Sequence, residues 1–131
     1  MVNALNQYRT YQVDTANRED FVALLYDGAR RFTAKALSAL EAGRLSEVSL
    51  YTGKAQRIFT ELTVSLNYDA GEISTNLAKL YDYWSWRLSQ GLIKRDPQAF
   101  REVSETLVDM HAAWVEAARQ VRAARGTHSG V

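Results

Sequence analysis

One apolar seam near the end of the chain constrains the fold more than any other feature of the sequence. Its members recur at alternating spacings of three and four: Phe100, Val103, Leu107, Met110, Trp114, Ala117 and Val121. This alternation places them on one stripe of an α-helix that packs against near-antiparallel neighbours. The preceding Asp96-Pro97 pair is a helix start, with Asp as the N-cap and Pro in the first helical position. The sequence therefore predicts a helical bundle whose last helix begins at Pro97.

Three earlier segments also have helical spacing. The first runs from Phe21 to Ala42, with Asn17 as its expected N-cap and Gly43 as the residue that ends it. Ser46 is the expected N-cap of the second, which ends near Asn67. The third spans about residues 73–92.

The connections between these helices are short, which forces consecutive helices to run antiparallel. The predicted fold is all-α: an antiparallel up-down-up-down four-helix bundle with an extended N-terminal arm. We expect the arm to occupy residues 1–16, the bundle 17–125 and a flexible C-terminal tail 126–131.

The composition and charge of the chain exclude several classes of function. The chain has no cysteine, which excludes disulfides and thiolate metal sites, and its net charge is only +1, which gives no electrostatic footprint for nucleic acid. No apolar stretch approaches the roughly 20 residues of a membrane span. His111 and His128 are the two histidines, and neither has a metal-ligand spacing. We therefore expect a cytoplasmic protein that binds no nucleic acid, enters no membrane, needs no cofactor or metal and is not an enzyme.

The helices carry more apolar surface than one core stripe requires. Tyr83 lies well off the core arc of the third helix, and Trp86 points roughly opposite to it. The first helix adds a second stripe that includes Val22 and Tyr26. Two neighbouring helices could cover that stripe, or it could form a groove for a foreign apolar helix. The pattern leaves both open, but the exposed aromatic residues favour a protein that binds a partner.

The N-terminal arm lacks helical periodicity and yet carries Tyr8, Tyr11 and Val13. A disordered tail is usually poor in aromatic residues. We therefore expect the arm to dock on the bundle, close enough to a binding groove to help clamp a ligand or to be displaced by it.

Four blocks between about Asn6 and Glu116 together resemble the flagellar secretion chaperone family FliS. They are Tyr8-x-x-Tyr11-Gln12-Val13-x-Thr15-Ala16 in the arm, Leu24-Leu25-Tyr26-Asp27-Gly28-Ala29, Lys54-Ala55-Gln56-x-Ile58-x-x-Glu61-Leu62-x-x-Ser65-Leu66, and Asn76-Leu77-x-x-Leu80-Tyr81-Asp82-Tyr83-x-x-x-Arg87-Leu88 with the later Trp114. Their order and spacing are more specific than any single block.

The resemblance implies a cytoplasmic chaperone that binds the disordered C-terminal segment of flagellin, prevents its premature polymerisation and delivers it to the type III export gate of the flagellum. It also implies that the arm packs near the flagellin-binding surface, with Tyr8, Tyr11, Gln12 and Val13 as contacts. To these we add Val22, Tyr26, Tyr83 and Trp86 as predicted partner-binding residues, on the strength of the extra apolar surface.

The chain departs from the family at Trp86, where arginine is commoner, so its outer contact surface has its own character. Two alternatives remain. One is a helical adaptor or homodimer without a flagellin client, whose aromatic face is its interface. The other is a small all-α enzyme acting on an anionic substrate, which would require arginine side chains that converge on a pocket in the bundle.

Overall fold

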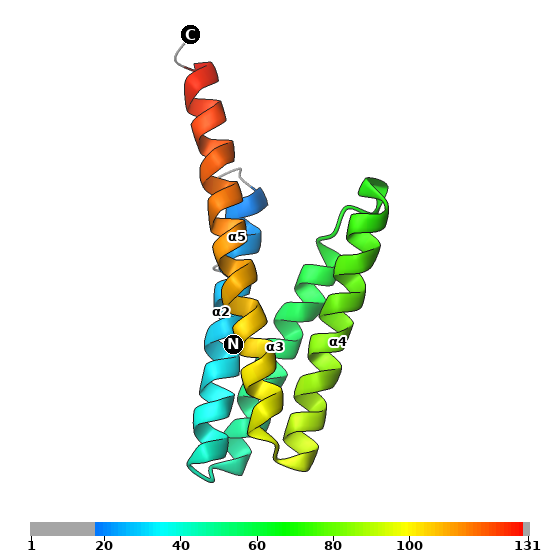
Figure 1. Ribbon diagram of the computed structural model, residues 1–131, viewed down its shortest axis with the longest axis vertical. Helices are drawn as coiled ribbons and strands as arrows, with labels where there is room; N and C mark the ends of the chain where they lie inside the picture. The colour runs from blue at the N-terminus through cyan, green and yellow to red at the C-terminus, as the bar shows by residue number, and fades with distance from the viewer. Residues whose placement is uncertain (1–17, 130–131) are drawn as a thin grey trace.

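The computed structural model describes residues 18–129, and within them it contains four long helices and one short 3-10 turn, with no strand. The helices are α2 (Arg18–Glu41), α3 (Leu45–Val64), α4 (Glu72–Lys94) and α5 (Pro97–Ser129), and the turn η1 (Tyr68–Ala70) joins α3 to α4. They alternate in direction, which confirms the predicted all-α, up-down-up-down bundle (Figure 1). The predicted arm, residues 1–16, lies outside the described residues.

The helices form a ring in which each contacts two others. α2 packs against α3 and α5, and α4 packs against the same two. The shared core is built from large side chains that are almost completely buried: Leu25, Tyr26, Phe59, Tyr81, Trp84, Leu88, Phe100, Val103 and Leu107. Because α2 has a helix on either side, its wide apolar arc is largely covered by its own neighbours. Val22 and Tyr26 of the second stripe are both buried.

The connection between α2 and α3 is short and turns at Gly43. Gly43 has a φ of 74°, and its N–H donates to the Leu40 carbonyl while the Arg44 N–H donates to the Ala39 carbonyl. This pair of bonds is a Schellman motif, and it confirms Gly43 as the residue that ends the helix. The motif returns the chain so directly that α3 begins at Leu45, with Arg44 as its N-cap. The predicted N-cap, Ser46, was therefore wrong: it lies inside the first turn.

The other ends differ from the predictions by a few residues. The N–H of Gln98 donates to Oδ1 of Asp96 over 3.0 Å, so the predicted cap of the last helix is confirmed. α3 ends at Val64, three residues before Asn67. The Ser65 N–H still makes a helical bond to the Glu61 carbonyl, whereas the Leu66 N–H bonds to the Thr63 carbonyl in a tighter turn. α5 runs on to Ser129, past the predicted end of the bundle at residue 125.

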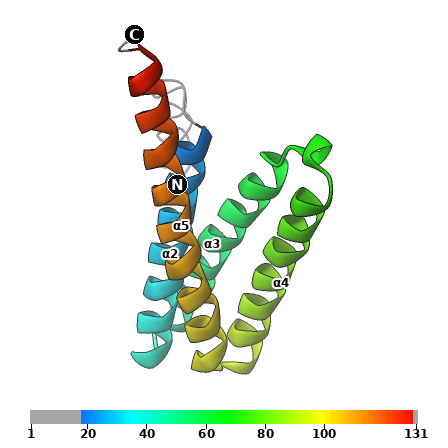
Figure 2. The same cartoon turned by 45° about the horizontal axis from the view of Figure 1, so that its top comes forward.

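The two ends of the bundle are packed differently. At one end Gly91 of α4 lies so close to α5 that a Cβ there would come within 2.7 Å of Ala99 Cβ and 2.8 Å of Phe100 Cε2. At the other end the α3–α4 pair diverges from the α2–α5 pair, and the molecule has the outline of a V (Figures 1 and 2). We call these the closed end and the open end.

Candidate functional site

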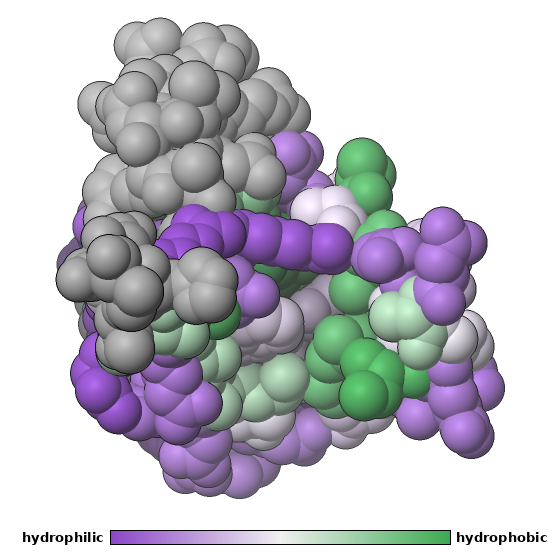
Figure 3. Space-filling view, turned by 90° about the horizontal axis from the view of Figure 1, so that it is seen from above, coloured by the Kyte–Doolittle hydropathy of each residue, from purple (hydrophilic) through white to green (hydrophobic). Residues whose placement is uncertain are grey.

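A groove with a volume of about 220 Å³ lies between the two helix pairs at the open end. Its apolar lining comes from every long helix and from η1: Val22, Leu62, Leu66, Ala70, Ile73, Leu77, Tyr81 and Trp114. Five polar residues complete it: Arg18, Glu19, Ser65, Asn67 and Ser74. Figure 3 looks down on this end, where hydrophobic residues gather within and beside the hollow and hydrophilic atoms cross above it. We call it the open-end groove.

Aromatic side chains make the floor of the groove rigid. The hydroxyl groups of Tyr26 and Tyr81 lie 2.8 Å apart and share a buried hydrogen bond. The Tyr26 ring stacks on Trp114 at a centroid distance of 6.2 Å and meets the edge of Trp84 at 6.0 Å. Burial raises the pKa of both tyrosines, so the hydroxyl groups stay protonated and bonded to each other. A ligand in the groove therefore meets a preformed apolar floor.

The walls, by contrast, are only partly covered. Leu66, Leu77 and Trp114 pack against the core and are nevertheless half-buried. At the rim, Ile73 is 69% exposed. Isolated exposed apolar residues are ordinary, but a contiguous set around a hollow indicates a binding surface.

Two charged side chains tie α2 to its neighbours at the open end, and one of them crosses the groove. The Arg18 side chain of α2 donates from Nη2 to the backbone carbonyl of Ser65, 2.5 Å away at the end of α3. On the other side, Arg122 of α5 pairs with Asp20 of α2. The first contact joins the two helix pairs, and the second joins α2 to the extended part of α5.

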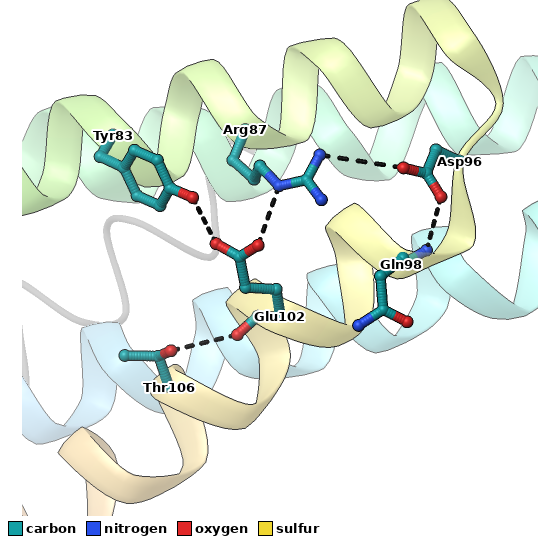
Figure 4. A network of polar contacts seen from close by, with 6 residues as sticks. All are labelled: Tyr83, Arg87, Asp96, Gln98, Glu102 and Thr106. Carbon is teal, nitrogen blue, oxygen red and sulfur yellow. Dashed lines mark hydrogen bonds and ion pairs between the residues drawn. The ribbon is translucent and has the colours of Figure 1, made fainter.

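A second surface lies on the outside of α4, on the side opposite its buried face. Trp86 is 56% exposed and Tyr83 is 42% exposed, and their rings are in contact at 5.9 Å. Both are too exposed to be core residues, as the sequence predicts. The Tyr83 hydroxyl donates to Glu102 of α5 over 2.5 Å, which holds the ring against the α4–α5 seam (Figure 4).

Glu102 is the centre of a polar network that ties α4 to α5. Arg87 Nε donates to its second oxygen over 3.0 Å, and the Arg87 guanidinium also lies 3.9 Å from Asp96 (Figure 4). The hydrogen bond from Tyr83, followed by that from Arg87, lowers the pKa of Glu102. The hydrogen bond to Glu102 raises the pKa of Tyr83. The network lies near the closed end and links its two helices.

The predicted partner-binding residues that the structure describes lie in two separate places. Val22 lines the open-end groove, and Tyr26 lies fully buried beneath it. Tyr83 and Trp86 lie on the far side of α4, away from the groove. Tyr8, Tyr11, Gln12 and Val13 lie outside the described residues.

Several groove residues were not predicted to be part of a binding site. Leu62, Leu66, Leu77, Tyr81 and Trp114 all occupy core-type positions in the helical pattern. For Leu62, Leu66 and Leu77 the signal is their place near the end of the α3 segment and the start of the α4 segment, where a bundle has fewest neighbours. Tyr81 and Trp114 lie well inside α4 and α5 and gave no such signal. Arg18 gave no signal, because it precedes the first apolar residue of its helix.

Metal-ligating and cationic side chains are sparse around the groove that the described residues form. Among the described residues, no group of three or more histidine, aspartate or glutamate side chains could hold a metal ion. The groove lining contains a single arginine, whereas an enzyme for an anionic substrate requires several that converge. Within the described part of the chain, no helix has the length and hydropathy to cross a bilayer.

Comparison with known proteins identifies the family. The model of the family described as "Flagellar protein FliS" matches residues 1–121. The chain belongs to the FliS family. It is 33% identical over 129 residues to the flagellar secretion chaperone FliS of Bacillus subtilis, with 96% of each chain covered. It is also 35% identical over 104 residues to the FliS of Salmonella typhimurium, covering 78% of this chain and 77% of that one.

A solved structure shares the FliS-type fold. A crystal structure of a flagellar chaperone from bacteria superposes with a TM-score of 0.73 and covers 88% of this chain and 98% of the other. Its sequence identity is 21%, so the likeness concerns the fold. The curated relatives are named as secretion chaperones, which agrees with a binding protein.

Proposed function

We propose that this protein is a cytoplasmic export chaperone that binds the disordered C-terminal segment of flagellin in the open-end groove. In this role it prevents premature polymerisation and delivers the segment to the flagellar type III export apparatus. The observation that supports the proposal best is the groove itself: an apolar hollow bordered by half-buried leucines in a member of a flagellar chaperone family.

The physical chemistry of the groove suits such a client. An amphipathic helix can lay its apolar face into a groove of this kind, and the rigid aromatic floor needs no rearrangement to receive it. A client that is disordered when free loses conformational entropy on binding, which offsets part of the interaction energy. A large buried surface can therefore coexist with release at the export gate.

The remaining predicted contacts extend this proposal. The arm residues Tyr8, Tyr11, Gln12 and Val13 would border the bound client. Tyr83 and Trp86 would contact it only if it wraps from the groove to the outer face of α4, because the two surfaces lie on different sides of that helix. Components of the export gate would then meet the loaded chaperone.

A pair of matched variants tests the groove. Leu66 is half-buried at its edge, just after the end of α3, whereas Leu50, on α3, is 51% exposed and outside the groove lining. With a synthetic peptide of the flagellin C-terminal segment from the same organism, we expect Leu66→Glu to weaken binding at least about tenfold, because it places a charge in an apolar contact. Leu50→Glu should bind like the wild type. Calorimetric titration with no binding heat for the wild-type protein, and no gain of helix in its circular dichroism, would contradict the proposal.

The exposed Tyr83–Trp86 pair also favours a second use, self-association into a homodimer. Size-exclusion chromatography with light scattering, with and without the flagellin peptide, measures it. A dimer that is lost in Trp86→Ala supports this interface. A wild-type monomer at all concentrations leaves the outer face to another partner.

A further inference from the structure

Arg18 lies between two hollows. One is the open-end groove, and the other is a neighbouring hollow of about 340 Å³ between α2 and α3, lined by Phe21, Val22, Glu61, Val64 and Ser65 together with Arg18 itself. Arg18, Val22 and Ser65 line both. The side chain of Arg18 spans from α2 to the Ser65 carbonyl, so it divides a surface that would otherwise be continuous. A helix lying in the groove must pass beside this guanidinium.

The acceptor that holds Arg18 is weak for a guanidinium. Five N–H groups in a planar fork can bind both oxygens of a carboxylate. Among the described residues, the hydrogen bond of Arg18 goes to a single neutral carbonyl. Ser65 is the C-cap of α3, so the contact also benefits from the negative end of that helix. A carboxylate would still be the stronger acceptor, because charge-assisted bidentate bonds exceed bonds to a neutral carbonyl.

The charge of Arg18 also acts inside the groove. Burial raises the pKa of Tyr81 on the floor, and the charge of Arg18 opposes that rise. Two carboxylates stand nearby, Glu19 in the groove lining and Glu61 in the neighbouring hollow, and each has interactions of its own. Their negative charges repel an anion in the groove, so an incoming carboxylate gains binding energy only where it contacts the Arg18 guanidinium directly.

We propose that Arg18 is a recognition residue for the client, and that binding moves its guanidinium from the Ser65 carbonyl to a carboxylate of the client helix. The inference rests on the proposed function. The movement would join the two hollows, so that apolar side chains of the client could anchor at Leu62 and Leu77 on one side and at Phe21 and Val64 on the other. The carboxylate is either an acidic side chain or the chain end of the client.

The test is a set of double-mutant cycles on the full-length protein. The titrant is the synthetic flagellin C-terminal peptide, and the variants are Arg18→Ala, Arg18→Gln and the control Arg44→Ala. Arg44 is an exposed arginine paired with Glu47, and it does not line the groove. Arg18→Gln can still donate to the Ser65 carbonyl but carries no charge. It therefore separates the role of Arg18 in binding a client carboxylate from its role in holding the end of α3. We expect both Arg18 variants to bind at least about tenfold more weakly and Arg44→Ala to bind like the wild type.

The peptide is varied in parallel. One form is amidated at its C-terminus, and others replace each Asp by Asn and each Glu by Gln, one at a time. We expect one modified peptide to lose its affinity for the wild-type protein, down to the affinity of the original peptide for Arg18→Gln. With Arg18→Gln itself, that modified peptide should bind as well as the original peptide, because the contact is already absent. That non-additivity identifies the carboxylate and shows whether it is a side chain or the chain end.

Two results would overturn the inference and leave the proposed function intact. One is an Arg18→Gln variant that binds the original peptide as tightly as the wild type does. The other is that, for every modified peptide, the losses of binding free energy from the peptide change and from Arg18→Gln simply add. If Arg18→Ala does not fold, Arg18→Gln alone decides. Absence of binding by the wild-type protein removes the proposed function and this inference together.

Discussion

At the scale of single residues, Gly91 is the most constrained position of the closed end. A methyl group there would meet Ala99 and Phe100 at distances far below van der Waals contact, and both neighbours belong to the α5 helix that α4 must approach. The neighbours are themselves fully buried, so neither can move without disturbing the core.

We therefore expect Gly91→Ala to destabilise the protein by about 1–3 kcal/mol, the usual cost of overpacking. Gly53 is the matched control, since it lies inside α3 and a methyl group added there would have nothing within 4 Å. Gly53→Ala should stabilise by about 0.5–1 kcal/mol through helix propensity alone. Urea unfolding followed by circular dichroism measures both. Equal stability of Gly91→Ala and the wild type would show that the helices separate at no cost.

The Tyr26–Tyr81 hydrogen bond makes a second prediction at this scale. Both hydroxyl groups are buried, and each is the other's partner. Tyr81→Phe should cost about 1–3 kcal/mol, because it takes a partner from the buried Tyr26 hydroxyl. The double variant Tyr26→Phe/Tyr81→Phe should cost less than the sum of the two single variants, since neither hydroxyl then remains without the other. Strict additivity in the unfolding free energies would mean that the two hydroxyl groups are not coupled.

At the scale of helices, local chemistry predicted the elements better than the site. The Asp96 side chain accepts from the Gln98 N–H, and the Gly43 N–H donates to the Leu40 carbonyl. Both bonds join residues close by in sequence, and both positions were predicted correctly. The divergence of the helix pairs has no such local cause, because it depends on how whole helices cross. Leu77 and Trp114 therefore appear as core positions in sequence and become groove walls in the structure.

The network around Glu102 gives a prediction about α4 and α5 together. Tyr83 and Arg87 lower the pKa of this carboxyl. Its contribution to stability is therefore present above its unfolded pKa and is lost as the pH falls through the lower folded value. We expect Glu102→Gln to lower the unfolding midpoint slightly at pH 7, by a small amount because the network is exposed. The difference should begin to shrink as the pH falls below the unfolded value of about 4.3, and should vanish only below the lowered folded value. A difference that persists unchanged at low pH would assign the effect to packing.

At the scale of the whole molecule, the two ends of the bundle should differ in dynamics. The closed end is held by the close packing at Gly91 and by the Arg87–Glu102–Tyr83 network. The open end has a hollow at its centre and exposed apolar residues at its rim, notably Ile73 and Val64. Fewer buried contacts mean a smaller free energy of local opening.

Backbone hydrogen exchange measures this difference directly. We expect amides in residues 60–78 to exchange faster than those in residues 84–94, because the first segment surrounds the hollow and the second crosses the closed end. Binding of the flagellin peptide should protect residues 60–78, since filling the groove supplies the packing that the bundle lacks there. In Leu66→Glu the same peptide concentration should give less added protection. Uniform protection of both segments in the free protein, unchanged by peptide, would mean that the open end is already as well packed as the rest, and that a client could enter only by unfolding part of the bundle.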